Sequence, residues 1–315
     1  MFRVIGDQPK ADHAFQGWTL DRKSPTKLRL PYGKKYHGEQ FYQNRILHSV
    51  IKQIMLVKDI IAVLEQVAPP HLQETYDNSG LLVGGFDRIV TGILCCLDST
   101  EAVVEEAVRK NCNLIVAHHP IVFRGLKRLN GTDYVQRTVI RAIEAGVAIY
   151  AIHTNLDNVH RQGVNAKIAE KLGLHRTRIL VPRPGTPDIG AGLVGELADP
   201  LPEANFLQLL KDQLYAGCVR HTALSGKPVQ RIAVCGGSGS FLLPAAQQAG
   251  ADVFVTADFK YHEFFDADGQ ILIADVGHYE SEQFTIHLLY EIIREKFPTF
   301  ALHCTDLNTN PVFYG

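Results

Sequence analysis

The sequence predicts an α/β protein of two similar units, each with a mixed or parallel sheet covered by helices. Short apolar runs alternate with amphipathic segments along most of its 315 residues, a length sufficient for two such units. The segments EAGVAIYAIHT and QAGADVFVTAD also share a helix end, an Ala-Gly turn, a strand and polar residues where the strand ends. This likeness favours an internal duplication, with functional residues at the C-terminal ends of strands between the units.

The first unit is expected over residues 55–180. Apolar residues at helical spacing predict a helix that begins near Met55 and ends at Pro69. Gly146 and Gly173 are typical of residues that follow the last turn of a helix. The remaining elements are predicted as strand 90–97, helix 100–111, strand 113–118, helix 133–145, strand 147–153 and helix 163–172.

A Pro- and Gly-rich stretch, LVPRPGTPDIGAG, is typical of a linker, which we place at residues 181–192. The second unit is expected over residues 193–315, and its closing elements are free to pack back on the first unit. Its elements are predicted as helix 202–214, strand 230–235, a helix ending at Gly250, strand 252–256, a short helix, strand 270–274 and a long helix over about 280–296.

Residues 1–54 differ from the rest of the chain in charge. They contain 10 Lys and Arg against 4 Asp and Glu, a net of +6, whereas the remainder has 22 against 29, a net of −7. They show no sustained periodicity, so we expect a basic, poorly ordered extension. Its four acidic residues argue against a mitochondrial transit peptide. A dispensable or misassigned leader before Met55 is the simpler interpretation.

Composition excludes several classes of protein. A formal charge of −1 is not that of a globally basic, nucleic-acid-coating protein, so a nucleic-acid partner is not expected. No apolar run approaches the roughly 18 residues that a membrane-spanning helix needs. The six cysteines show no CxxC spacing, which indicates buried free thiols in a reducing cytoplasm. The expected location is therefore cytoplasmic.

Five metal-competent side chains follow the ends of three separate apolar runs. His118 and His119 end LIVAHHP, Asp157 follows AIYAIHTNLD, and His278 and Glu282 lie in ILIADVGHYESE. Imidazole nitrogens and carboxylate oxygens suit Zn, Fe, Mn, Co or Ni. Because ligands of open parallel sheets bind beyond the carboxyl ends of the strands, these residues predict a metal site there.

The spacing of these residues also bears on the number of metals. Adjacent histidines on an extended chain point to opposite sides, so His118 and His119 could serve two neighbouring ions. His278 and Glu282 are four residues apart, which places them about 5–6 Å from each other on one helix face. Two ions are accommodated if Glu282 bridges them. Taken singly, the HxxxE pair is more often a solvated pair and Asp157 an Asx turn.

Further polar residues lie at turns or strand ends. His262 and Asp258 are the candidates for catalytic proton transfer, since an imidazole pKa near 6.5 suits that task. Asp77, Asn78 and Asp98 are expected to contact substrate or to support the ligands, although capping and turn hydrogen bonds explain Asp77 and Asp98 equally well.

The motif GGSGS could bind phosphate. Its residues are Gly236, Gly237, Ser238, Gly239 and Ser240, between a predicted strand and a helix whose free N–H groups could hold an anion. The motif lacks the lysine and the spacing of a P-loop. A tight turn from strand to helix explains the glycines equally well.

Seven segments resemble the GTP cyclohydrolase I type 2 homologues, also called NGG-interacting-factor-three-like proteins. They occur in the family's order over residues 55 to about 315: YDNSGLLVG, LIVAHHPIVF, AIHTNLDN, GVNAKIAEKLGL, GGSGSF, TADFKYHEFFDA and ADVGHYESE. The resemblance implies two divalent metal ions, one held by His118 and His278 and the other by His119 and Asp157, with Glu282 bridging them. It also implies two similar α/β domains, a toroidal homohexamer, and a short form without the middle domain that longer members insert.

Two functions from different classes follow. The first is a dinuclear metal-dependent hydrolase, GTP cyclohydrolase type 2-like, that acts on a nucleotide or related heterocycle. The second is a non-enzymatic metal-binding regulatory or interaction protein, or a metal chaperone. Open coordination positions favour the enzyme, whereas ready metal release without turnover favours the alternative. Nucleic-acid binding through the toroid is a weaker hypothesis, because residues 55–315 are acidic.

Overall fold

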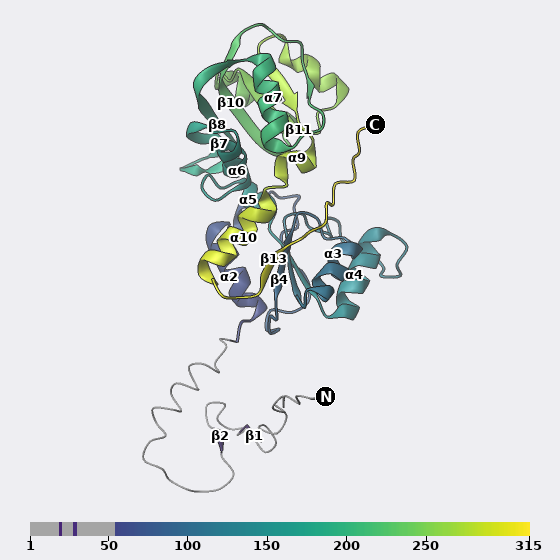
Figure 1. Ribbon diagram of the computed structural model, residues 1–315. Coiled ribbons are helices and arrows are strands. Elements are labelled where there is room, and N and C mark those ends of the chain that lie inside the picture. Colours follow the sequence, from purple (N-terminus) through teal and green to yellow (C-terminus); the bar gives the residue numbers. More distant parts are fainter. Residues whose placement is uncertain (1–18, 21–27, 30–53) are drawn as a thin grey trace, which may run out of the picture. The chain divides into compact units, whose positions relative to one another are not determined.

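The computed structural model describes residues 19–20, 28–29 and 54–315, which belong to two compact units, Met1–Gln53 and Ile54–Gly315. In the first unit, the short strands β1 (Thr19–Leu20) and β2 (Leu28–Arg29) pair antiparallel (Figure 1). Apart from these four residues and Ile54, the basic extension expected over residues 1–54 lies outside the described part of the chain. The second unit contains all the other elements.

The first sheet has five strands in the order β13-β4-β5-β6-β3. Four of them run parallel, and β3 pairs antiparallel with β6 at one edge. The two central strands are buried throughout, as the uninterrupted apolar runs predict. The strand bounds are β3 (Gly80–Val83), β4 (Ile93–Cys96), β5 (Leu114–Ala117), β6 (Ala148–Ala151) and β13 (Leu302–Cys304).

Helices cover both faces of this sheet. On one face lie α3 (Glu101–Arg109) and α4 (Tyr134–Ala145), which pack apolar side chains against Leu94, Ile115 and Ile149. On the other face lie α2 (Val57–Val67) and α10 (Thr285–Lys296). Each helix buries one side, because its apolar residues recur at helical spacing.

The second sheet has six strands in the order β7-β8-β10-β11-β12-β9, with a parallel centre of β10, β11 and β12. Helices α6 (Val164–Lys171) and α7 (Glu203–Leu214) pack on one face and α8 (Leu243–Gln248) on the other. The strand bounds are β7 (His175–Arg183), β8 (Thr186–Pro202), β9 (Arg220–His221), β10 (Pro228–Ser238), β11 (Val253–Ala257) and β12 (Leu272–Asp275). The expected α/β architecture with two mixed, helix-covered sheets is confirmed.

The segment 181–192, expected as a linker, instead lies within the long antiparallel hairpin of β7 and β8. Pro182 is tolerated because β7 is the edge strand of its sheet. Gly190 is needed for close packing, since a Cβ there would meet Pro182 Cα at 2.7 Å and the residue has φ +153°. Prolines and glycines that are typical of a loop therefore serve here as strand residues.

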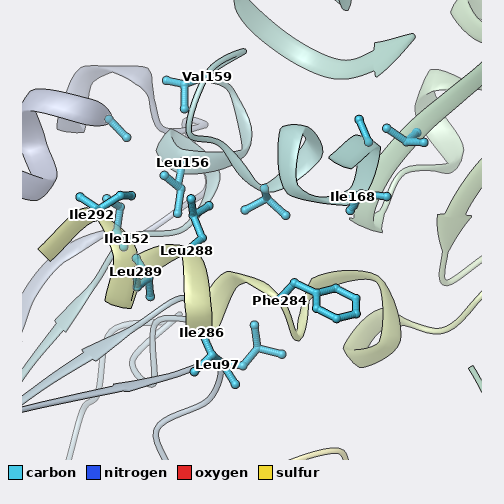
Figure 2. Packing of buried hydrophobic residues seen from close by; sticks show 14 of the residues in the cluster. Leu97, Ile152, Leu156, Val159, Ile168, Phe284, Ile286, Leu288, Leu289 and Ile292 are labelled. Carbon is cyan, nitrogen blue, oxygen red and sulfur yellow. The ribbon is translucent and has the colours of Figure 1, made fainter. Parts of the chain in front are cut away.

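One hydrophobic core joins the two sheets. It extends from the α2 and α10 face of the first sheet to the α6 and α7 face of the second (Figure 2). Leu156, Ile168 and Leu288 belong to this cluster although they come from α5 (Thr154–Asp157), α6 and α10. The closing elements α10 and β13 pack on the first sheet, so the last elements of the second unit return to the sheet that its first elements form.

The predicted long helix near the C-terminus consists of two helices. The short α9 (His278–Glu282) packs against β10 and β11 of the second sheet, and α10 begins at Thr285 and packs on the first sheet. The break allows one segment to change direction between the sheets. Three short 3₁₀ helices, η1 (Pro70–Leu72), η2 (Ser240–Leu242) and η3 (Tyr261–Ala267), connect other elements. Among the described residues, no helix is long and apolar enough to span a bilayer.

Candidate metal centre

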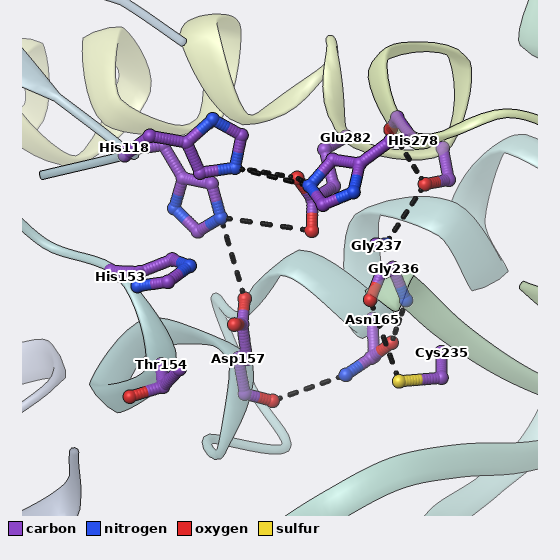
Figure 3. Close-up of polar contacts among 12 residues, drawn as sticks. His118, His153, Thr154, Asp157, Asn165, Cys235, Gly236, Gly237, His278 and Glu282 are labelled. Atoms are coloured by element: carbon purple, nitrogen blue, oxygen red, sulfur yellow. Dashed lines mark hydrogen bonds and ion pairs between the residues drawn. The ribbon is translucent and has the colours of Figure 1, made fainter. Parts of the chain in front are cut away.

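The five predicted ligands converge between the two sheets (Figure 3). His118 and His119 directly follow β5, and Asp157 ends α5, which follows the neighbouring parallel strand β6. His278 and Glu282 begin and end α9, so they lie on one face of that single turn. Two ends of parallel strands and one short helix thus place three imidazoles and two carboxylates together.

The first set of donor atoms, here the inner group, consists of His118 Nε2, Asp157 Oδ1 and Glu282 Oε1. His118 Nε2 lies 3.6 Å from Asp157 Oδ1 and 3.9 Å from Glu282 Oε1. The His118 side chain is fully buried and the Glu282 side chain is 3% exposed. The Asp157 side chain is 25% exposed, but its Oδ1 atom is buried.

The second set, here the outer group, consists of His119 Nε2, His278 Nε2 and Glu282 Oε2. The carboxylate oxygen lies 2.9 Å from the His119 nitrogen and 3.1 Å from the His278 nitrogen. The two imidazole nitrogens are 3.4 Å apart. The side chains of His119 and His278 are 21% and 39% exposed, so His278 is the most exposed ligand of the two groups.

This arrangement reverses the pairing expected from the family resemblance, which joined His118 to His278 and His119 to Asp157. Strand β5 lies between β4 and β6, and each histidine turns toward a different neighbour. His118 Nδ1 donates to the backbone carbonyl of Ile152, beyond β6, which directs its Nε2 to Asp157. His119 Nδ1 hydrogen bonds Asp98, beyond β4, and its Nε2 faces α9.

Each histidine of the cluster is oriented through its Nδ1 atom. His119 pairs with Asp98 at 2.7 Å and His278 with Asp258 at 2.7 Å, whereas His118 uses the Ile152 carbonyl at 2.9 Å. A partner at Nδ1 fixes the tautomer and leaves Nε2 free to bind a metal, and a carboxylate partner makes the imidazole more basic. Asp98 and Asp258 therefore orient histidines of the cluster, and their expected roles toward substrate or in proton transfer stay predictions.

His153 is a sixth member of the cluster that the sequence-based interpretation missed. Its donor atom lies within 4.8 Å of those of His118 and His119. Its Nδ1 pairs with Asp77 at 2.7 Å, and the Asp77 carboxylate also accepts from the N–H and the hydroxyl of Thr154. The residue stands in the segment AIHTNLD, two residues beyond β6, a position that could have identified it.

The other predicted residues have structural roles or lie elsewhere. Asn78 donates from its side chain to the carbonyl of Val122, in the loop that follows the double histidine. His262 is exposed on η3 and is not among the residues that line the cavity beside the centre. Its expected role in proton transfer therefore stays a prediction.

The glycines of GGSGS allow β10 to approach the centre closely. A Cβ on Gly237, which has φ +62°, would lie 2.5 Å from Glu282 Oε1 and 3.1 Å from His278 Cε1. The N–H of Gly236 donates to Asn165 and that of Gly237 to Ser281. These two donors are therefore engaged inside the protein, which contradicts a phosphate cradle at Gly236 and Gly237. Ser238, Gly239 and Ser240 remain only a prediction in that role.

The acidic and basic side chains of the centre shift one another's pKa values. Burial lowers the pKa of His119, but hydrogen bonds to Asp98 and Glu282 outweigh it and raise that pKa to about 9. Burial likewise opposes a charged His278, yet the Glu282 charge and the Asp258 hydrogen bond raise its pKa to about 11. Burial raises the pKa of Asp157 to about 7, with the Glu282 charge adding to it. Protons thus bind at atoms that a cation would otherwise occupy.

The residues present fit divalent metal ions. His118 Nε2 and Asp157 Oδ1 are both buried without a hydrogen-bond partner among the described residues. Their separation of 3.6 Å is too long for a hydrogen bond but close to the about 3.3 Å between two ligands of one tetrahedral metal. Buried polar atoms left unpaired are costly, and a cation between them removes that cost. The His, Asp and Glu cluster can therefore hold metal.

A cavity of about 680 Å³ opens beside the centre. His119, His153, Asp157, His278 and Glu282 line its inner wall. Three exposed aromatic side chains, Tyr76, Phe123 and Phe241, line it as well. The Tyr76 and Phe123 rings have centroids 6.4 Å apart, and Phe123 meets His153 edge-on at 6.3 Å. The cavity thus combines metal ligands with flat apolar surfaces.

Comparison with known proteins agrees with this geometry. Residues 55–311 match the family described as Duf34/NIF3 (NGG1p interacting factor 3). A protein of Clostridium perfringens called GTP cyclohydrolase 1 type 2 homolog is 33% identical over 243 residues, which cover 77% of this chain and 92% of that protein.

Solved structures resemble the fold over nearly their whole length. A Staphylococcus aureus hypothetical protein is 29% identical with a TM-score of 0.74, covering 82% of this chain and 99% of its own. A Bacillus cereus protein related to NIF3 has a TM-score of 0.77 at 24% identity, covering 84% and 100%, and supports the fold alone. The resemblance drawn from the seven sequence segments, and the short form without an inserted domain, are confirmed.

Proposed function

We propose, on the premise that the chain belongs to the Duf34/NIF3 family, that it is a dinuclear metal-dependent hydrolase, GTP cyclohydrolase type 2-like. Its substrate would be a nucleotide or a related heterocycle. The observation that carries the proposal is Glu282, whose two carboxylate oxygens face two different groups of histidine and aspartate donors. One bridging carboxylate between two donor sets is the arrangement that holds a pair of metal ions close together.

The two ions would be held by the inner and the outer group, with Glu282 common to both. A bound metal ion would lower the pKa of water toward about 7 and polarise the group under attack. His153 lines the cavity and is oriented by Asp77, so it is placed to give or take a proton there. It replaces His262 in this role.

The cavity walls favour a flat ring as substrate. Tyr76, Phe123 and Phe241 present aromatic faces on which a heterocycle could stack, and each stacked ring excludes water from the reacting atoms. A volume of about 680 Å³ lies within the range of about 300–1,000 Å³ typical of small-molecule sites. The aromatic walls, rather than the GGSGS motif, therefore support the choice of a nucleobase-like substrate.

The test is a hydrolysis screen over nucleotides and related heterocycles, with elemental analysis of the same preparations. We expect turnover by metal-loaded protein and none after chelation or in Glu282→Ala. Glu291→Ala is the matched control, since Glu291 is an exposed carboxylate on α10 that pairs with Lys167 away from the cluster. Metal-dependent turnover that survives Glu282→Ala would refute the assignment.

A second candidate is a metal-binding regulatory protein or metal chaperone. It is favoured by the exposure of His278, at 39%, which would let a partner or chelator reach the outer ion. Under this hypothesis the protein exchanges its metal readily and turns over no substrate. Stoichiometric metal that chelators remove within minutes, together with a negative hydrolysis screen, would establish it over the hydrolase.

We also propose a toroidal homohexamer as the working assembly, as the family resemblance implies. Exposed apolar side chains on and after the loop following β5, Leu126, Leu129 and Tyr134, offer contact surface. Light scattering on purified protein measures the mass directly. A monomer at micromolar concentration would refute the hexamer without affecting the metal centre.

A further inference from the structure

We propose that the C-terminal segment Thr305–Asn310 is a positioning element of the metal centre, acting through Thr309 and Asn310. It rests on the proposed function only in requiring that the centre binds metal. The segment follows β13 and contacts, in succession, α3, the support of His119 and helix α9. These contacts join the two elements that supply the outer group.

The start of the segment is anchored on helix α3 and its C-cap residue. Thr305 donates its hydroxyl to the buried carboxylate of Glu106, and the Asp306 N–H donates to the same carboxylate at 2.8 Å. Lys110 pairs with Asp306 at 2.9 Å and donates to the Cys304 carbonyl at 3.2 Å. The chain beyond therefore leaves α3 in a fixed direction.

The next contact reaches a metal ligand through one intermediate. The Thr309 hydroxyl donates to Asp98 Oδ2 at 2.6 Å, while Asp98 Oδ1 hydrogen bonds His119 Nδ1 at 2.7 Å. Thr309 thus holds one carboxylate oxygen so that the other stays aligned with the imidazole. Without the hydroxyl, Asp98 gains freedom to rotate, and His119 loses part of the restraint on its Nε2 direction.

The following residue holds the opposite side of the outer group. The Asn310 side-chain amide donates to Glu280 Oε1 at 3.0 Å, and Glu280 stands between His278 and Glu282 on α9. Helix α9 is a single turn of five residues, so it has little stability of its own. Ligand positions must be held to within about 0.5 Å for tight metal binding. Two consecutive residues therefore restrain both His119 and α9.

The decisive variant is Thr309→Val, which keeps the shape and removes the hydroxyl. We expect metal affinity in the outer group to fall about 3- to 10-fold, less than the 10–100-fold typical when a direct partner of a ligand is lost. Thr309→Ser should restore it. Thr91→Val is the matched control, because it also removes one hydroxyl hydrogen bond, to the Asn111 carbonyl, away from the centre.

The readouts separate positioning from general stability. Metal affinity is measured by chelator competition with zinc, and the melting temperature is measured on metal-free protein. The inference predicts that Thr309→Val and Thr91→Val change melting alike, whereas only the former weakens zinc binding. Unchanged zinc affinity in Thr309→Val, or a loss that serine does not restore, would overturn the inference. Wild-type protein that holds no metal would instead overturn the proposed function.

A second variant covers the case in which Thr309→Val does not fold. Asn310→Ala removes the contact to Glu280 at a half-buried position. We expect faster hydrogen exchange of the α9 amides in metal-free protein, with exchange in α3 unchanged. Exchange in α9 that matches the wild type would contradict a bracing role for the segment.

Discussion

The inner and outer ligand groups share Glu282 but differ in how the fold supports them. In the inner group, the fully buried His118 donates to a backbone carbonyl, which strand geometry fixes. In the outer group, the partly exposed His119 and His278 rely on the carboxylates of Asp98 and Asp258. A backbone carbonyl is held in place by the fold, whereas a carboxylate makes the imidazole more basic and belongs to a side chain that can move. If each group holds an ion, as proposed, we expect the inner group to retain its ion and the outer group to exchange its ion more readily.

The largest expected effect is the loss of metal when a group loses a ligand that it does not share with the other group. Asp157→Asn should empty the inner group and His278→Ala the outer, because each removes a donor that the other group does not use. Native mass spectrometry should then find about one ion per chain in each variant instead of about two. Loss of both ions from either variant would show that the groups bind as one unit and would end the comparison.

A substitution at Gly237 should weaken both groups together. In Gly237→Ala the new Cβ would lie 2.5 Å from Glu282 Oε1, so the shared carboxylate must move, and we expect at least about tenfold weaker binding of both ions. Gly173→Ala is the control for backbone strain. It has φ +66°, close to the +62° of Gly237, but no atom within 4 Å of the added Cβ. Both variants should lose about 1–2 kcal/mol of stability, and only Gly237→Ala should lose metal.

Loss of a carboxylate support should affect the outer group alone. Asp258→Asn removes the charged partner of His278 Nδ1, and we expect about 10–100-fold weaker zinc binding there with the inner ion retained. Asp188→Asn is the matched control, since Asp188 pairs with His160 Nδ1 on the surface away from the cluster. Equal weakening of both ions in Asp258→Asn would contradict a separate outer group.

The smallest expected difference between the two groups is in how their metal affinity depends on pH. Protons compete with metal at His119, whose pKa is raised to about 9, and at Asp157, whose pKa is raised to about 7. Because a raised pKa keeps the proton bound at higher pH, outer-group affinity should continue to increase from pH 7 to pH 9, whereas the acid of the inner group is already half deprotonated at about pH 7. Chelator competition on Asp157→Asn and His278→Ala at several pH values compares the two groups. Parallel pH profiles would contradict this assignment of protons.

The sequence predicted the centre well where geometry is set by strand ends. Parallel strands β5 and β6 are adjacent, so His118, His119 and Asp157 had to come close, and the four-residue spacing of His278 and Glu282 placed them on one helical turn. The grouping of the donor atoms differs from the pairing that the resemblance implied. This grouping depends on which neighbouring strand each Nδ1 atom reaches, and local sequence does not determine the order of strands in a sheet.

Other failures have similar causes. The composition of residues 181–192 predicts a linker, whereas the structure places their prolines and glycines in the hairpin of β7 and β8, where edge position and close packing accommodate them. His153 was passed over because Asp77, the partner that orients it, is far away in sequence. The contacts of the C-terminal segment could not be predicted either, because Thr309 and Asp98 are 211 positions apart in the chain.

The continuous core shown in Figure 2 has a thermodynamic consequence. Because one apolar cluster covers a face of each sheet, unfolding of either sheet would expose the apolar face of the other to water. Denaturation should therefore occur as a single cooperative transition. Any cation bound only by the native chain then adds its binding free energy to that one transition. A chelator would therefore lower the melting temperature of the entire unit, including helices remote from the histidines.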